Sequence, residues 1–184
     1  MDEILKVDID IYNRIQKWVW SLILTEQALD LYDYIMEKRE QLFTKEVSID
    51  LFPMKIIHAG YNITLDIAPI YFMRVFTTGH GVETKMSSNK SAEIEVIRNE
   101  MIDFVCKEMG WSKEDWASFY EPICKDRNQL VAHFDATAVD FSEDGNMHSY
   151  KTSLSGDKEI KRLRQVISLM KKYLSKFKHP NTDQ

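Results

Sequence analysis

The feature that most limits what this chain can fold into is a long amphipathic stretch from Ile9 to Phe43. Its apolar residues recur at three- and four-residue steps, the period that puts side chains on one face of an α-helix. They include Ile11, Ile15, Trp18, Leu22, Leu29, Tyr32 and Met36. Thr25 could cap a new helix inside this stretch, so the pattern leaves open whether it forms one long helix or two.

The rest of the chain repeats the helical period with few interruptions, because it holds only 6 glycines and 4 prolines in 184 residues. Helices are predicted over about 51–76, 92–109 and 113–133, and a last helix is predicted to follow Asp157, which caps it. Pro69 should kink or split the first of these near Ala68. Gly110 and the pair Ser112 and Asp115 should end one helix and begin the next. Residues 135–156 are irregular and allow a short hairpin. The expected fold is all-α: one domain, 1–184, as an up-and-down bundle of about five helices.

The charges of the chain are unevenly distributed. The formal net charge is −5, which gives no overall attraction for nucleic acid. The last helix is nevertheless basic, from Lys158 to Lys178. Such a run is more often a solvated face than a phosphate-binding track, and the same holds for the acidic residues Asp30, Asp33, Glu37 and Glu40.

The sequence lacks the signals of export, membrane insertion and metal chemistry. No signal peptide begins the chain, and the longest apolar run, Trp18 to Leu24, is too short to span a bilayer. Cys106 and Cys124 form no C-x-x-C motif, so a reducing cytoplasmic location is expected. No Glu-x-x-His, His-x-x-x-His or Gly-x-Ser-x-Gly pattern occurs, which predicts no metal and no cofactor.

One arginine interrupts an otherwise apolar helical stripe. The stripe of the 113–133 helix runs through Trp116, Phe119, Tyr120 and Ile123, and its next position is Arg127. A buried guanidinium needs a partner, so Arg127 should either pair with a carboxylate or lie where a ligand can reach it. Asn128 follows directly, and His133 lies on the flank of the same stripe.

Arg127, Asn128 and His133 together resemble the motif of the HEPN superfamily, in its abortive-infection type: an arginine, a polar residue, and a histidine a few positions on. The resemblance implies a helical homodimer in which arginine and histidine line a cleft between protomers and cleave RNA without metal. It also implies a role in phage defence or as a toxin with an antitoxin partner. The three residues are the predicted catalytic site.

The chemistry of these side chains suits that reaction. An imidazole that titrates near neutral pH can exchange protons with the ribose 2′-hydroxyl and the leaving 5′-oxygen. A forked guanidinium can hold the phosphate in its transition state, and Asn128 could orient either group. On a regular helix, however, positions 127 and 133 are about 120° and roughly 9 Å apart. Either the helix loosens at its end, or Arg127 of one subunit acts with His133 of another.

Three alternatives remain at the level of sequence. Arg127 could be structural, paired with Asp126, Asp135 or a carboxylate of the first helix, while His133 caps the helix C-terminus. The chain could be a non-catalytic helical module for dimerisation or binding. It could also hold a nucleotide phosphate at Arg127 without cleaving it.

Overall fold

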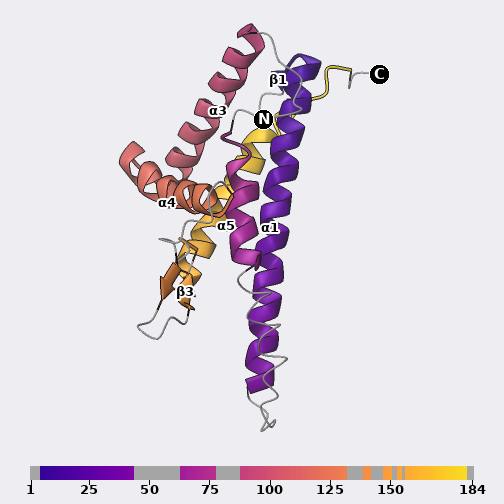
Figure 1. Ribbon diagram of the computed structural model, residues 1–184. Coiled ribbons are helices and arrows are strands. Elements are labelled where there is room, and N and C mark those ends of the chain that lie inside the picture. The colour runs from indigo at the N-terminus through magenta and orange to yellow at the C-terminus, as the bar shows by residue number, and fades with distance from the viewer. Residues whose placement is uncertain are drawn as a thin grey trace.

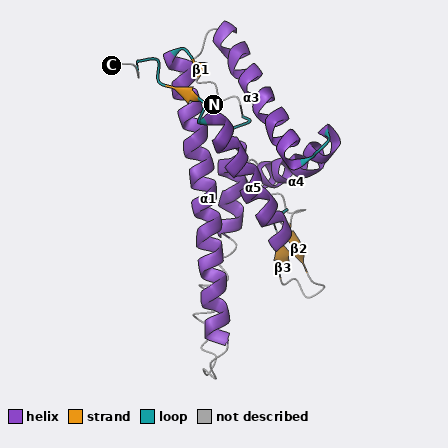
Figure 2. Ribbon diagram, turned by 180° about the vertical axis from the view of Figure 1, so that it is seen from behind, coloured by secondary structure: helices purple, strands orange, loops and turns teal. Residues whose placement is uncertain are grey.

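The computed structural model describes residues 5–43, 63–77, 88–131, 139–141, 147–150, 153–154 and 156–181, and their side chains except in 39–43, 129–131 and the strands 139–141 and 147–150. The predicted all-α helical bundle is confirmed (Figure 1). The described helices are α1 (Ile9–Phe43), a segment over 63–73, α3 (Ser88–Met109), α4 (Lys113–Val131) and α5 (Asp157–Leu174). Seen from either side, α4 lies across the others rather than along them (Figures 1 and 2).

The first amphipathic stretch forms the single helix α1. Thr25 does not begin a second helix, because its hydroxyl donates to the carbonyl of Ser21 at 2.8 Å inside the continuous helix. Ser21 makes the same bond one turn earlier, to the carbonyl of Lys17 at 2.9 Å. A hydroxyl satisfied in this way can be buried in a helix interior, and Thr25 is fully buried. The alternative of two helices is therefore wrong.

Local capping signals set the junction between α3 and α4. Gly110 has a φ of 66°, and the amide of Trp111 donates to the carbonyl of Cys106 at 2.8 Å, as in a left-handed helix stop. Ser112 and Asp115 then form the predicted capping box: the Ser112 amide donates to Asp115 Oδ2 at 2.9 Å, and the Asp115 amide donates to Ser112 Oγ at 3.1 Å. These two caps fix where α4 begins.

Two other predicted boundaries differ. The helix over 63–73 runs through Pro69 without splitting at Ala68, and its predicted start near residue 51 lies outside the described residues. Asp157 is the first residue of α5 rather than its cap. The N-cap is Gly156, which has extended φ and ψ and makes no side-chain capping bond.

The described residues include four short strands. The predicted hairpin is confirmed by β2 (Val139–Phe141) and β3 (Met147–Tyr150), which pair antiparallel. The second pair, β1 (Leu5–Lys6) and β4 (Phe177–Lys178), was not predicted; it is parallel and aligns Leu5 with Phe177. This pair ties the chain just before α1 to the chain just after α5.

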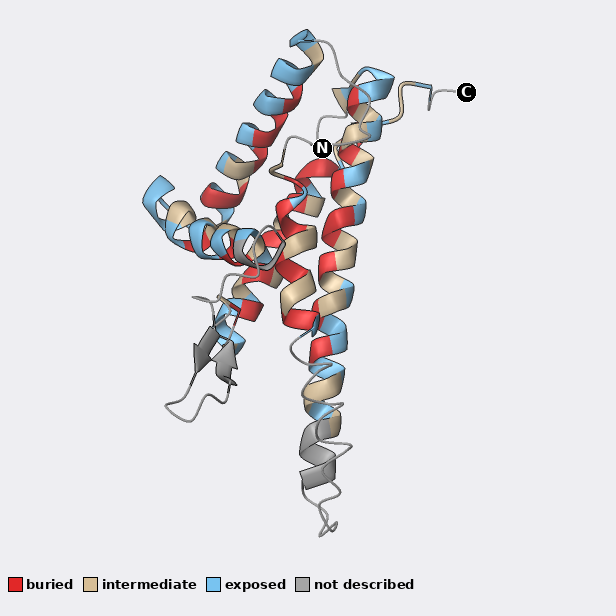
Figure 3. Ribbon diagram, in the orientation of Figure 1, coloured by how far each residue is buried: buried red, intermediate tan, exposed pale blue. Residues whose placement is uncertain are grey.

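The core lies where α1, α3, α5 and the 63–73 helix meet, as the buried surfaces in Figure 3 show. Its largest fully buried side chains include Trp18, Phe72, Met101, Leu163 and Ile167. The described buried apolar residues form one cluster, with aromatic rings of α4 packed at its edge. Burial of this apolar surface is the main force that holds the helices together.

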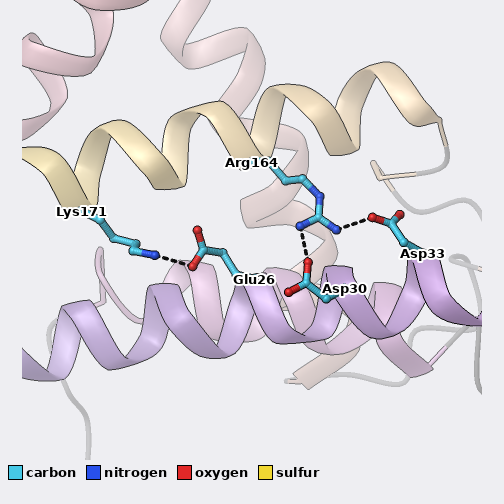
Figure 4. A network of polar contacts seen from close by, with 5 residues as sticks. All are labelled: Glu26, Asp30, Asp33, Arg164 and Lys171. Atoms are coloured by element: carbon cyan, nitrogen blue, oxygen red, sulfur yellow. Dashed lines mark hydrogen bonds and ion pairs between the residues drawn. The ribbon is translucent and has the colours of Figure 1, made fainter.

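Ion pairs fasten α5 to α1 beside this core (Figure 4). Arg164 donates from Nη1 to Asp30 and from Nη2 to Asp33, both at 2.6 Å, and Lys171 donates to Glu26 at 2.5 Å. Arg162 lies over the ring of Trp111, and Lys176 over the ring of Phe104. Several basic side chains in and just after α5 therefore contact other residues of the chain. Asp30 and Asp33 keep exposed side chains but hold Arg164, so they are more than a solvated face.

Candidate functional site

The predicted site lies at the C-terminal end of α4. The buried residues of this helix are Phe119, Ile123 and Asp126, spaced by four and then three positions. Asp126 is thus the charged residue that faces the interior, with 7% of its surface exposed. Arg127, one position further, is only half-buried on the flank of this face. The prediction that Arg127 continues the core-facing stripe is wrong by one position.

Asp126 can occupy the interior because it binds a backbone amide there. Its Oδ2 accepts a hydrogen bond at 2.5 Å from the amide of Ser153, the residue three positions before the cap of α5. A buried carboxylate that accepts a backbone hydrogen bond avoids much of its desolvation penalty. Asp126 therefore attaches the segment that precedes α5 to α4. The sequence did not indicate this structural role.

Arg127 and Asn128 contact each other. Arg127 Nη1 donates to Asn128 Oδ1 at 2.8 Å, and Asn128 Nδ2 lies 3.7 Å from the sulfur of Cys124 one turn earlier. No described carboxylate pairs with Arg127, and the proposed partner Asp126 binds Ser153 instead. The guanidinium is held in place by a neutral amide, so its positive charge is not neutralised by the described part of the chain.

The third predicted residue, His133, lies outside the described residues, as does Asp135. The last residue of α4 is Val131, two positions before His133. The separation of about 120° between positions 127 and 133 applies to a regular helix that includes both. The geometry between Arg127 and His133 therefore also lies outside the described structure.

The charges of Arg127 and of a second arginine, Arg98, both act on Tyr120. Burial, together with Cys124, raises the pKa of the Tyr120 phenol to about 12, while Arg98 and Arg127 act in the opposite direction. Two guanidinium groups, one from α3 and one from α4, therefore lie near this hydroxyl. Tyr120 stays protonated at neutral pH and can donate a hydrogen bond, but it is no base.

Arg98 is the arginine that the core encloses. It is 7% exposed, donates from Nη1 to Glu95 at 2.8 Å, and lies 5.4 Å from the ring centroid of Trp18. Its Nε has no hydrogen-bond partner among the described residues. The signal in the sequence was an arginine among Ile94, Ile97 and Met101 in the α3 stripe, the same kind of signal that drew attention to Arg127.

A carboxylate pair between the 63–73 helix and α4 was also missed. Burial raises the pKa of Asp66 to about 6, and the nearby charge of Asp126 acts in the same direction. Asp66 Oδ1 is buried and has no hydrogen-bond partner in the described structure. Within the sequence, the only hint was an aspartate among apolar neighbours; its proximity to Asp126 depends on tertiary packing.

A hollow of about 420 Å³ lies at the other end of α4, against α3. Its lining consists of Asn99, Ile102, Asp103, Cys106, Lys113 and Trp116. Burial, with help from nearby Asp103 and Asp115, raises the pKa of the Cys106 thiol, so the thiol is not an activated nucleophile. Position 113 is about 21 Å from position 127 along the helix axis, and the hollow is thus separate from the Arg127 site.

No group of three or more His, Cys, Asp or Glu side chains among the described residues is arranged to hold a metal ion. No described helix combines the length and apolar character needed to cross a bilayer.

Comparisons of the chain with protein-family models, with curated protein sequences and with solved structures find no match. The class that the structure defines is an all-α helical bundle with an arginine–asparagine pair at the end of α4. The function must therefore be inferred from that pair.

Proposed function

We propose that this chain is a metal-independent endoribonuclease of the HEPN type, which works in the cytoplasm as a homodimer and serves as a toxin or phage-defence protein. One observation supports it most: the half-buried Arg127 guanidinium is held by Asn128 at 2.8 Å and pairs with no described carboxylate. A structural arginine normally has its charge neutralised by a carboxylate. A guanidinium that is oriented in this way, with no carboxylate paired to it among the described residues, is suited to bind a phosphate from solution.

Each residue has a defined role in the reaction. His133 removes the proton of the ribose 2′-hydroxyl, whose oxygen then attacks the adjacent phosphorus. The bond from phosphorus to the 5′-oxygen breaks, and that oxygen receives a proton as it leaves. Arg127 binds the non-bridging oxygens and stabilises their added negative charge, while Asn128 fixes the direction of the guanidinium. The products are a 2′,3′-cyclic phosphate and a 5′-hydroxyl.

We infer that Arg127 and His133 of the same chain act together. A pair within one chain requires the segment between the two residues to depart from a regular helix, in which they would lie about 120° apart. If the helix continues regularly through both positions, Arg127 of one subunit must act with His133 of the other.

The test is cleavage of a labelled RNA of mixed sequence in EDTA by purified wild type, Arg127→Ala, Arg127→Lys, Asn128→Ala and His133→Ala. The alanine variants of Arg127 and His133 should lose at least about 100-fold in rate, as expected for loss of a transition-state donor or a general acid–base. Arg127→Lys keeps the charge but loses the forked donors, and should remain strongly impaired.

Lys125→Ala is the matched control, because Lys125 is an exposed cation of the same helix. It should cleave like wild type, and circular dichroism should show that all variants are folded. Equal cleavage by Arg127→Ala and wild type, or no cleavage by folded wild type, would contradict the proposal.

A second candidate is a non-catalytic helical module for dimerisation or binding. It is favoured by the large exposed apolar side chains on α1, among them Trp20, Leu31 and Tyr34. Such a module would cleave no RNA and would keep its partner when Arg127 or His133 is replaced. Toxicity on expression separates the two functions, since only a nuclease would lose it through Arg127→Ala.

A further inference from the structure

The hollow between α3 and α4 carries polar groups that the fold itself does not use. Successive turns of α3 supply the amide of Asn99 and the carboxylate of Asp103, and the first residue of α4 supplies the ammonium group of Lys113. All three residues are exposed, and none has a hydrogen bond or an ion pair with another described residue. Their side chains are therefore available to a ligand that enters the hollow.

The two charged groups lie near the same buried side chain. Burial is the main cause of the raised pKa of the Cys106 thiol, and Asp103 raises this pKa further while Lys113 lowers it. A carboxylate and an ammonium group thus lie on different helices around Cys106, yet they form no ion pair with each other. A ligand between them can bind both, through a hydrogen-bond donor at Asp103 and an anionic group at Lys113.

Trp116 gives the hollow an aromatic wall whose position is fixed. The half-buried indole stacks on the ring of Tyr120, with 5.9 Å between the centroids and 18° between the planes. It also packs at tilted angles on Phe76 and Phe119. A ring that is held on several sides loses little conformational freedom when a ligand stacks on it, and this favours binding.

The size and the lining of the hollow fit one class of ligand. Its volume of about 420 Å³ is within the range of small-molecule sites. It does not suit a metal ion, because the described residues contain no group of three side chains that could hold one. A flat ring for Trp116, hydroxyl donors for Asp103 and an anion for Lys113 occur together in a nucleotide. We propose that the hollow binds one nucleotide of a single-stranded RNA.

Each part of the nucleotide has a residue to bind it. The base stacks on Trp116, and Asn99 bonds to the base edge, where an amide can both donate and accept. Asp103 accepts a hydrogen bond from the ribose 2′-hydroxyl, a group that DNA lacks. Lys113 binds the phosphate, so the phosphate lies on the wall opposite the carboxylate of Asp103.

The hollow and the Arg127 site lie along one side of α4. Lys113, Trp116, Tyr120 and Arg127 fall within about 60° of one another around the helix axis. Trp116 is about 16 Å from Arg127 along the axis, which is the length of about five stacked nucleotides at 3.4 Å each. An RNA strand bound at Arg127 can therefore reach the hollow. This inference rests on the proposed function, because the strand is the one that Arg127 and His133 cleave.

The first test compares the binding of a fluorescent RNA of about ten nucleotides, which spans both sites, with that of DNA of the same sequence, by anisotropy. The protein is the full chain with His133→Ala, so that binding is measured without cleavage. Lys113→Ala should weaken RNA binding about tenfold and reduce the slope of log K against log salt by about 0.7, the value for one phosphate contact on a single strand. Asp103→Ala should lower the preference for RNA over DNA, since only RNA has the 2′-hydroxyl.

Lys107→Ala and Glu93→Ala are the matched controls, because both residues are exposed charges of α3 that do not line the hollow. Both variants should bind RNA like the parent chain. Unchanged RNA binding by folded Lys113→Ala, or an unchanged ratio of RNA to DNA affinity in Asp103→Ala, overturns the proposal.

Tryptophan fluorescence tests where the base lies. A base stacked on Trp116 should quench its emission, and Trp116→Phe should remove this part of the quenching while the phenyl ring still supports binding. Trp18, Trp20 and Trp111 supply the background emission in both chains. Equal quenching of the two chains would mean that the base does not stack on Trp116, and the site would be wrong.

A free mononucleotide has the same base, ribose and phosphate as a unit of RNA, so adenosine 5′-monophosphate is titrated as a competitor. If it weakens RNA binding to the parent chain but not to Lys113→Ala, the two ligands share the hollow, as proposed. If it binds through Lys113 while RNA binding does not depend on Lys113, the occupant is a free nucleotide and the RNA assignment is overturned.

The hollow and the nuclease fail in different measurements. RNA binding that depends on Lys113, without any cleavage by wild type, would support the hollow and contradict the nuclease. Cleavage by wild type with a KM that Lys113→Ala leaves unchanged would support the nuclease and overturn the hollow. If both proposals hold, Lys113→Ala should raise KM for a long RNA about tenfold and change kcat little, in contrast to Arg127→Ala.

Discussion

The half-buried carboxyl of Asp66 should make the stability of this protein depend on pH. Its pKa in the folded state is about 6, because burial and the charge of Asp126 both disfavour its ionised form. In the unfolded chain the pKa is about 3.9. Below about pH 4 the group is protonated in both states and carries no penalty. Between about pH 4 and 6 the unfolded chain ionises while the folded Asp66 holds its proton, so the free energy of unfolding falls across this window. It levels off above about pH 6, where the folded state carries the buried charge.

The size of this effect follows from the shift. About two pKa units correspond to ~3 kcal/mol, and because Asp66 is only half-buried, solvent screening reduces this to ~1–2 kcal/mol. Asp66→Asn removes the charge at every pH while keeping the shape of the side chain. The variant should therefore be more stable than wild type by ~1–2 kcal/mol at neutral pH, about 2–8 °C in Tm, and nearly equal at about pH 4.

Urea unfolding followed by circular dichroism at about pH 4 and about pH 7.5 measures the difference. Asp103→Asn is the control, because it neutralises an exposed carboxylate on α3 and should change stability little at either pH. If Asp66→Asn fails to stabilise the protein at neutral pH, or does so equally at both pH values, then the assigned burial of the Asp66 charge is wrong.

Two further predictions concern the ion pairs between α1 and α5 and the candidate site. Arg164→Ala removes both bonds to Asp30 and Asp33 and should lower the free energy of unfolding by ~1 kcal/mol, and by less at high salt, because both carboxylates are exposed. If urea unfolding shows the same loss at low and high salt, packing and not charge is responsible. A mixture of Arg127→Ala and His133→Ala chains should cleave no more RNA than either variant alone, because each active site needs both residues of one chain. Recovery of up to about half the wild-type activity in mixed dimers would instead show that the two residues act across subunits.

Local signals were sufficient to predict most of the helices. The periodicity of α1, the glycine stop at Gly110 and the reciprocal bonds of Ser112 and Asp115 all depend on residues within a few positions of one another. Thr25 allowed two local interpretations, a helix cap or a hydroxyl that binds the carbonyl one turn back inside a continuous helix. The structure has the second, and Thr25 is fully buried there.

The site depended on contacts that the sequence does not encode locally. After Ile123, positions 126 and 127 both lie near the apolar stripe, and the amide of Ser153, which is 27 residues from Asp126, determines which one turns inward. The approach of Asp66 to Asp126 and the pairing of Leu5 with Phe177 are likewise set by distant parts of the chain. The contact of Arg127 with Asn128, in contrast, joins neighbours that the motif had already singled out.

The ion pairs between α1 and α5 have a consequence for synthesis on the ribosome. Glu26 and its partner Lys171 are 145 residues apart, so at 5–20 residues per second α1 is made roughly 7–30 s before its ionic partner. Until then the buried apolar face of α1 lacks the helix that covers it in the finished fold, while Trp20, Leu31 and Tyr34 on its other side are exposed at every stage. Nascent chains on neighbouring ribosomes would thus present apolar side chains on two faces of one helix, and a chaperone that binds the first forty residues would protect the protein at its most aggregation-prone stage.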